Sequence, residues 1–194
     1  GINSCNLFVE KDNYLHFLKL YEKYIEPVAE TYAWCLMPNH FHLLVYIKEQ
    51  KEIPTLPAFE TLPAFETLAG LNTTQKYNPS KQFSHLFNAY SQAFNKRYNR
   101  TGSLFEKPFD RKVVTNNGYF RELVFYIHNN PVHHGFVKQM IEYPWTSYGT
   151  IISLKQTKLQ RDKVIGWFDN AGNFVEFHKQ KQEIHAIKDL LFDK

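Results

Sequence analysis

Cysteine is scarce in this chain of 194 residues, which contains only Cys5 and Cys35. Two cysteines are too few for the disulfide framework that holds many small secreted proteins together. Long apolar runs are missing as well, because no stretch approaches the roughly 20 residues that a membrane-spanning helix needs. No charged-then-apolar leader marks the chain for export. We therefore expect a cytoplasmic protein without membrane association, in which Cys35, placed in an apolar run, is a buried thiol.

The net charge of +4 is unevenly distributed along the chain. Residues 1–75 carry five Lys/Arg against nine Asp/Glu, a net of −4. Residues 76–145 carry ten against four, a net of +6, and residues 146–194 carry eight against six, a net of +2. Aromatic residues are interleaved with the basic ones in the middle segment. That combination suits a nucleic-acid surface, although a solvated basic face explains the charge equally well.

Apolar periodicity and turn residues predict the order helix, hairpin, helix, strand, helix. Asp12 is the expected N-cap of the first helix, and Pro131 is expected to end the third helix at Asn130. The predicted elements are a helix from Asp12 to just before Pro27, strands at 31–36 and 40–47, a helix at 80–98, extended segments at 103–109 and 111–114, and a helix at 118–130 capped by Asn116 or Asn117.

With one more strand in front, this order would be the βαββαβ core of an α+β, ferredoxin-like fold with an antiparallel sheet. Beyond it, residues 159–168 and 174–192 are expected to be helical. We therefore divide the chain into a core domain at 1–149 and a helical C-terminal extension at 150–194.

Residues 48–80 form a polar connection that is rich in proline and threonine. The stretch TLPAFE occurs at 55–60 and again at 61–66. Two copies are too few for a repeat architecture, which needs about three or more units. A duplication in a tolerant loop is the simplest interpretation, although such a loop could also contact a partner.

Two histidines stand two residues apart in the second predicted strand. Alternate residues of a strand share a face, so His40 and His42 point one way while Phe41, Leu43 and Val45 form an apolar face. The Cα atoms of the two histidines would lie about 7 Å apart, which lets both imidazoles approach one metal ion. Histidines at this spacing also occur without any metal, so the pair alone does not define a site.

Tyr126 and Asn130 lie four residues apart in the third predicted helix and therefore share one of its edges. An asparagine carbonyl is a suitable oxygen ligand for a hard cation. A tyrosine one turn earlier would hold its phenol near the same ion. A helical tyrosine is usually a packing or surface residue, so this pair also needs support from elsewhere.

The segments NHFHLLV and YIHNNPVHHGFV together resemble the HUH single-strand DNA transposases that use one tyrosine, and above all the REP-associated tyrosine transposases. The family's His-hydrophobe-His motif is matched by His40-Phe41-His42, and its Y-I-x-x-N-P-V helix by residues 126–132. RTGSLFEKPF is similar to the family's segment before that helix. The resemblance covers residues 1 to about 149. Because the family has a further strand upstream, we expect the natural protein to have residues before Gly1.

The resemblance implies a metal-dependent endonuclease and strand transferase that cleaves single-stranded DNA near hairpins. Tyr126 would attack a phosphodiester and remain joined to the 5′ phosphate, releasing a 3′ hydroxyl. His40, His42 and Asn130 would hold Mg²⁺ or Mn²⁺. No general base is evident. Insertion-sequence relatives often have glutamine as the third ligand, and Asn130 follows the REP-associated pattern.

The resemblance further implies a repetitive palindromic DNA hairpin as partner and a bacterial cytoplasm with association to the nucleoid. A monomer, as in the REP-associated proteins, is favoured over the dimer of the insertion-sequence relatives, and both stay open. DNA contacts are expected from basic residues of the middle segment, namely Lys96, Arg97, Arg100, Lys107, Arg111, Lys112, His133 and His134. Two alternatives stay open. One is an HNH-like nuclease that uses water, suggested by IHNNPVHH, and the other is a domesticated hairpin-binding protein that does not cut.

Overall fold

The computed structural model describes residues 1–55, 76–106, 109–115 and 117–180. At its centre are two antiparallel strands, β1 (Ala29–Leu36) and β2 (Phe41–Ile47). Ala29 pairs with Ile47 and Leu36 with Phe41, with an irregularity in register between Thr31 and Ala33. The predicted hairpin is therefore confirmed, with boundaries shifted by no more than two residues.

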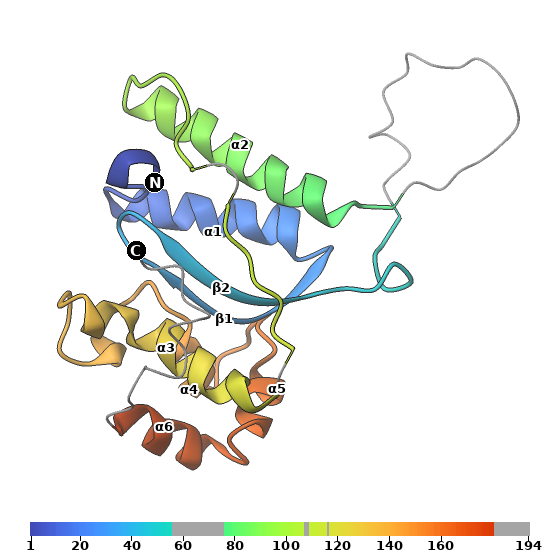
Figure 1. Cartoon of the computed structure of the whole chain (residues 1–194), viewed down its shortest axis with the longest axis vertical. Coiled ribbons are helices and arrows are strands. Elements are labelled where there is room, and N and C mark those ends of the chain that lie inside the picture. Colours follow the sequence, from blue (N-terminus) through green and yellow to red (C-terminus); the bar gives the residue numbers. More distant parts are fainter. Residues whose placement is uncertain (56–75, 107–108, 116, 181–194) are drawn as a thin grey trace, which may run out of the picture.

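Helices cover both faces of the hairpin (Figure 1). On one side lie α1 (Lys11–Ile25) and α2 (Pro79–Arg97), and on the other lie α3 (Phe120–His133), α4 (Tyr148–Ile152), α5 (Arg161–Gly166) and α6 (Ala171–Lys179). Short 3₁₀ turns occur at η1 (Ile2–Ser4), η3 (Asn117–Tyr119) and η4 (Met140–Glu142). The α+β class is confirmed, whereas the described residues do not contain a complete four-stranded ferredoxin-like sheet.

Alternation along β2 supplies a separate hydrophobic core on each side. Phe41 and Val45 join the core beneath α1 and α2, where Phe17 packs 5.2 Å from both Phe41 and Tyr90, measured between ring centroids. Leu44 belongs instead to the core shared with α3 and α6. The predicted division of this strand into an apolar face and a histidine-bearing face is therefore correct at Phe41 and Val45.

The first two helices begin at capping residues that satisfy their free N–H groups. Glu10 is the N-cap of α1, in a reciprocal capping box with Asn13, so the prediction of Asp12 as N-cap is wrong. Asp12 lies instead in the first turn of the helix. Asn78 caps α2 by accepting a hydrogen bond of 3.0 Å from the Lys81 N–H, and Pro79 follows as the first helical residue.

The third helix extends beyond its predicted end. α3 continues through Pro131 to His133, because its last turn is closed by hydrogen bonds from the His134 N–H to the Asn130 carbonyl (2.9 Å) and from the Phe136 N–H to the Pro131 carbonyl (2.8 Å). Burial of Pro131 in the protein holds that turn in place. The helix also starts later than predicted, at Phe120, after η3. Asn116 lies outside the described residues.

The segment before α3 does not form the predicted strand. Within residues 103–106 and 109–115 the structure has no β-ladder. Residues 145–147 run along the outer edge of β1 instead, where the Leu36 N–H bonds to the Trp145 carbonyl (2.8 Å) and the Ser147 N–H to the Trp34 carbonyl (2.9 Å). Sequence periodicity gave no signal for this short pairing.

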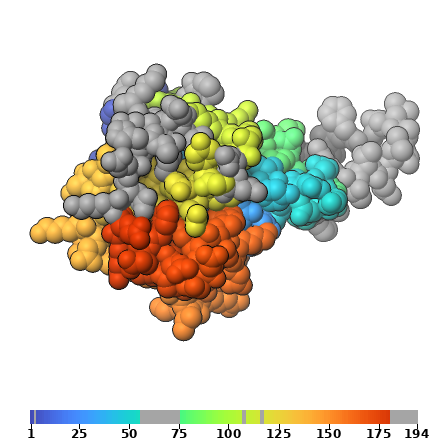
Figure 2. Space-filling model, turned by 60° about the horizontal axis from the view of Figure 1, so that its bottom comes forward, coloured from blue at the N-terminus to red at the C-terminus, as the bar shows by residue number. Residues whose placement is uncertain are grey.

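The C-terminal helices pack directly on the rest of the molecule. Val164, Phe168 and Phe174 are buried in the same core as Ala33 and Tyr126, and Figure 2 shows these helices (orange to red) continuous with the yellow segment that precedes α3. The predicted helices at 159–168 and 174–192 correspond to α5 and α6, although residues 181–194 lie outside the described part, as does most of the TLPAFE duplication. The division at 149/150 stays a prediction.

Candidate functional site

The two histidines of β2 lie side by side at the start of the strand. Their ring centroids are 5.1 Å apart, with the planes at 82°. The Asn39 side-chain oxygen lies 2.7 Å from Nδ1 of His40. An amide oxygen can only accept, so Nδ1 carries the proton and Nε2 of His40 presents its lone pair. The Nε2 atoms of both histidines are shielded from solvent.

Tyr126 and Asn130 reach the same place from α3. The Tyr126 ring is only 4% exposed and stands edge-on to His42, with ring centroids 5.4 Å apart. Asn130 is fully buried one turn later, and its amide donates a hydrogen bond of 2.9 Å to the Tyr126 carbonyl. That bond fixes which way the amide points. The Asn130 Oδ1 atom is buried and accepts no hydrogen bond from the described residues.

These groups have the chemistry of a donor set for a divalent cation. A buried acceptor oxygen without a hydrogen bond is costly unless something else binds it, and a cation satisfies it directly. Two imidazole nitrogens with one amide oxygen suit Mn²⁺ and, less well, Mg²⁺. Among the described residues, no three His, Cys, Asp or Glu side chains gather as a metal site. Asn130 is therefore the residue that would complete the set.

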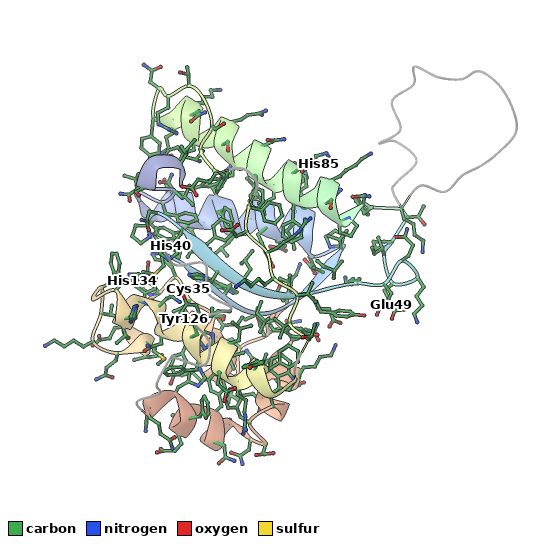
Figure 3. All side chains as sticks on the ribbon, in the orientation of Figure 1. Cys35, His40, Glu49, His85, Tyr126 and His134 are labelled. Atoms are coloured by element: carbon green, nitrogen blue, oxygen red, sulfur yellow. The ribbon has the colours of Figure 1, made fainter. Side chains whose placement is uncertain are left out.

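His134 lies at the same end of the molecule. Its ring centroid is 5.5 Å from that of His40 and 5.2 Å from that of His133. Figure 3 shows His40, His134 and Tyr126 close together where the hairpin turn meets the end of α3. Both His133 and His134 are exposed, so the two predicted DNA contacts of α3 stand beside the candidate site.

The other predicted DNA contacts have diverse surroundings. Arg97 forms ion pairs with Glu10 at 2.6 Å and with Asp12 at 3.1 Å. Because two carboxylates of the protein already neutralise its charge, this geometry does not favour a DNA contact. Arg100 bonds to Asn95 at 2.9 Å. Lys96 and Lys112 are exposed, Arg111 lies over the ring of Phe109, and Lys107 falls outside the described residues. The DNA-binding role of each remains a prediction.

A buried series of hydrogen bonds joins α3 to α6, and no pattern in the sequence predicted it. The His178 Nδ1–H donates to the Phe174 carbonyl (2.8 Å), which leaves Nε2 of His178 to accept from Nδ1–H of His128 (3.1 Å). The Ser147 hydroxyl then donates to Nε2 of His128 (2.7 Å) and accepts from the Trp34 N–H (2.9 Å). One arrangement of protons satisfies every atom of the chain.

This chain of bonds ties α3 to α6, to the start of α4 and to β1. Burial lowers the pKa of the His128 imidazole well below its ordinary value and lowers the pKa of His178 to about 4, so both rings are neutral near pH 7. His128 is fully buried and cannot contact DNA. Its contribution is to hold the helix that carries Tyr126 and Asn130.

One cavity of the molecule lies away from the candidate site. It has a volume of about 370 Å³ and lies between α1, the strands and residues 157–160, and none of the candidate site residues lines it.

The predicted buried thiol is confirmed, since Cys35 is fully buried and its pKa is raised by burial. Within the described residues, no helix is both long and apolar enough to span a membrane.

Comparison with known proteins gives one informative match. No protein-family model and no curated protein matches the sequence. A solved structure of a REP-associated tyrosine transposase bound to a REP hairpin does match, with a TM-score of 0.52 over 77% of this chain and 72% of the transposase chain. The two proteins share a fold. Their sequences are 18% identical, so the likeness establishes the architecture, and the activity must be argued from the site.

Proposed function

We propose that this protein is a single-strand DNA nuclease and strand transferase that cleaves near DNA hairpins through a covalent 5′-phosphotyrosine. The observation that carries the proposal is the placement of Tyr126 against His42, with the unsatisfied oxygen of Asn130 one turn away. The transposase of the same fold is bound to a REP hairpin. We infer a hairpin with single-stranded flanks as the substrate here.

In the proposed reaction, the Tyr126 oxygen forms a bond to phosphorus as the bond from phosphorus to the 3′ oxygen breaks. The phenol loses its proton, and the departing 3′ oxygen gains one. The protein–DNA link is again a phosphodiester, so a 3′ hydroxyl can attack it and rejoin strands without ATP. Packing against His42 restricts the Tyr126 ring, so that its hydroxyl is held in one position.

We assign His40, His42 and Asn130 as the residues that would hold Mg²⁺ or Mn²⁺. When bound there, the cation would offset charge on the phosphate oxygens and orient the attack. Asn39 keeps His40 in the required tautomer, and the hydrogen bond from Asn130 to the helix backbone directs its Oδ1. We also assign to the exposed His134, whose ring lies 5.5 Å from that of His40, a hydrogen bond to a phosphate oxygen of the DNA.

The test uses a pool of single-stranded oligonucleotides with randomised stems and flanks and a fluorophore at the 3′ end. The protein should form a denaturation-resistant adduct that retains the 3′ label in the presence of Mn²⁺, since the tyrosine bonds to the 5′ phosphate of that fragment. Tyr126→Phe should abolish the adduct. Tyr119→Phe, an exposed tyrosine at the start of the same helix, should leave it unchanged.

The alternative functions give different results. If Tyr126→Phe still cleaves and no adduct forms, water is the nucleophile and the protein is an HNH-like hydrolase. If the protein binds hairpins tightly with no cleavage, and binding is indifferent to Mn²⁺ and to Tyr126, it is a DNA-binding protein without nuclease activity. Either result would overturn the proposal.

A further inference from the structure

The turn after α3 has a fixed geometry that exposes an aromatic ring. Gly135 has φ of +72°, a left-handed conformation that favours glycine. The N–H groups of Gly135 and Phe136 donate to the carbonyls of Val132 (3.0 Å) and Pro131 (2.8 Å), which fastens the turn to the end of the helix. Phe136 is therefore held beyond the last turn of α3 at a defined place.

One aromatic ring of the described residues lies beside Phe136. It belongs to Tyr143, with ring centroids 6.4 Å apart at 56°. The Tyr143 hydroxyl donates a hydrogen bond of 2.9 Å to the Leu36 carbonyl at the end of β1, so the supporting ring is itself fixed. Phe136 nevertheless remains 53% exposed. An aromatic ring that packs beside another ring and is half exposed can stack on an unpaired base, and we refer to the Phe136 ring as the stacking platform.

This platform stands next to the candidate site. His134, whose ring lies 5.5 Å from that of His40, precedes Phe136 by two residues, and two residues span at most about 7 Å of chain. Successive phosphates of a DNA strand are separated by a comparable distance, about 3.4 Å along the axis of a duplex and more in an extended strand. A base next to a phosphate that is held by His134 beside the site would therefore reach Phe136.

The charges around the turn are compatible with DNA. The Glu142 carboxylate accepts hydrogen bonds from the N–H groups of Lys138 (3.0 Å) and Gln139 (2.9 Å), so its negative charge is turned toward the backbone. The Lys138 side chain is exposed, as are His133 and His134. In Figure 2 the segment after α3 (yellow-orange) lies at the surface of the molecule.

We propose that Phe136 is the stacking site for an unpaired nucleobase adjacent to the phosphodiester that Tyr126 attacks. The inference rests on the proposed function. An unpaired base has a free π-face, whereas a base inside a duplex is already stacked on both sides, so the site selects single-stranded DNA. Stacking is tolerant of base identity, and the site therefore sets where the strand is held more than which sequence is chosen.

The experiment measures binding in the Tyr126→Phe variant, so that no substrate is consumed. A hairpin oligonucleotide is first selected from a randomised pool by binding to this variant. Single abasic positions are then moved through its single-stranded flanks. One position should weaken binding by about fivefold to a hundredfold, the effect of losing one stacked base. Adding Phe136→Ala should weaken binding of the intact oligonucleotide to the same extent. In that variant, the abasic position should cause no further loss of affinity.

Matched variants separate stacking from general surface effects. Phe136→Trp should retain affinity, and Phe136→Leu should behave like alanine because it is apolar without a π-face. Ile141→Ala removes another apolar side chain that is also 53% exposed and should change nothing. Unchanged affinity in Phe136→Ala, or an equal loss with every abasic oligonucleotide, would overturn the inference. Since adduct formation is measured separately with Tyr126 present, failure of cleavage and failure of this base site are distinguishable.

Discussion

Two groups of histidines lie on or beside α3, and they differ in burial and in hydrogen bonding. His128 and His178 are buried, and each of their ring nitrogens has a hydrogen-bond partner. His40 and His42 lie at the turn end of the hairpin beside the exposed His134. A histidine whose hydrogen bonds are complete inside a core serves the fold, whereas imidazoles gathered beside an unsatisfied amide oxygen are suited to a ligand.

One helix serves both groups because of its periodicity. Two residues along an α-helix rotate the side chain by about 200°, so His128 points away from the direction shared by Tyr126 and Asn130. The same fourteen residues of α3 therefore hold the candidate site on one side and a structural network on the other. Changes at the two groups should separate activity from stability.

The largest expected effect is on cleavage. We expect His42→Ala to lower the rate of adduct formation by at least about a hundredfold, because even the residues behind metal ligands commonly contribute ten- to a hundredfold. The midpoint of thermal unfolding should change little, since His42 is only partly buried. Labelled hairpin DNA with Mn²⁺ and a thermal melt measure the two quantities. A loss of stability as large as that of His128→Ala would contradict this division.

His128→Ala is the matched opposite. It leaves the Ser147 hydroxyl and the His178 ring without their partner and opens a cavity in the core, so we expect a loss of about 2–4 kcal/mol in the free energy of unfolding. For a chain of this size that corresponds to a fall of roughly 5–15 °C in the melting temperature. At a temperature where the variant is folded, it should retain most of its cleavage.

Acid should act on the buried histidines first. Their pKa values are lowered on folding, that of His178 to about 4, so the stability they contribute is complete above the ordinary value of 6.5. As pH falls from 6.5 toward 4, only the unfolded chain takes up the proton, and His178 alone should cost about 3 kcal/mol in the free energy of unfolding. Urea unfolding at pH 7.5, 6.5 and 5.5 measures the trend. His178→Phe should make the free energy of unfolding depend less steeply on pH. An unchanged pH dependence in this variant would contradict the explanation.

A smaller effect is expected at Asn39, which positions His40. Asn39→Ala should weaken binding of Mn²⁺ by about tenfold or more, as is usual when the partner of a ligating histidine is removed. Asn39→Asp keeps an acceptor oxygen and should restore affinity. Calorimetric titration of Mn²⁺ into the DNA-free protein reports this without requiring activity. Equal affinity in Asn39→Ala would show that the orientation of His40 has another source.

The smallest effect is expected at Arg97. Because it already pairs with Glu10 and Asp12, Arg97→Ala should leave DNA affinity and its salt dependence nearly unchanged. Lys96→Ala removes an exposed neighbouring charge and should lower the slope of log affinity against log salt by about one. Fluorescence anisotropy between 50 and 200 mM salt, about the range in which such slopes are read, compares the two variants. An equal loss in both would assign Arg97 to the DNA surface after all.

The hairpin, the three long helices and the pairing of His40 with His42 could be predicted because each depends on local periodicity. Tyr126 and Asn130 also required only a helix and a spacing of four. What they would meet in space was inferred from a resemblance. The prediction that the helix ends before Pro131 was wrong, because tertiary packing and the turn at Gly135 stabilise the helix beyond the proline.

The remaining features depend on contacts between distant parts of the chain. His178 and His128 are partners across 50 residues, and Ser147 reaches Trp34 across 113. Arg97 gave a basic signal identical to that of Lys96, and only folding reveals that acidic residues near the N-terminus neutralise it. No local pattern distinguishes a lysine or arginine that is free from one that is paired.

The distance in sequence between the two halves of the site has a consequence for folding. His42 belongs to a hairpin that can form from local contacts, whereas Tyr126 arrives only when α3 docks, about 84 residues further along the chain. Closing such a long loop is entropically slow, so it follows the local steps. In a nascent or partly unfolded chain, Tyr126, the proposed nucleophile, is therefore separated from His40 and His42. Under the proposed function, cleavage of DNA therefore requires that the core between the hairpin and α3 is complete.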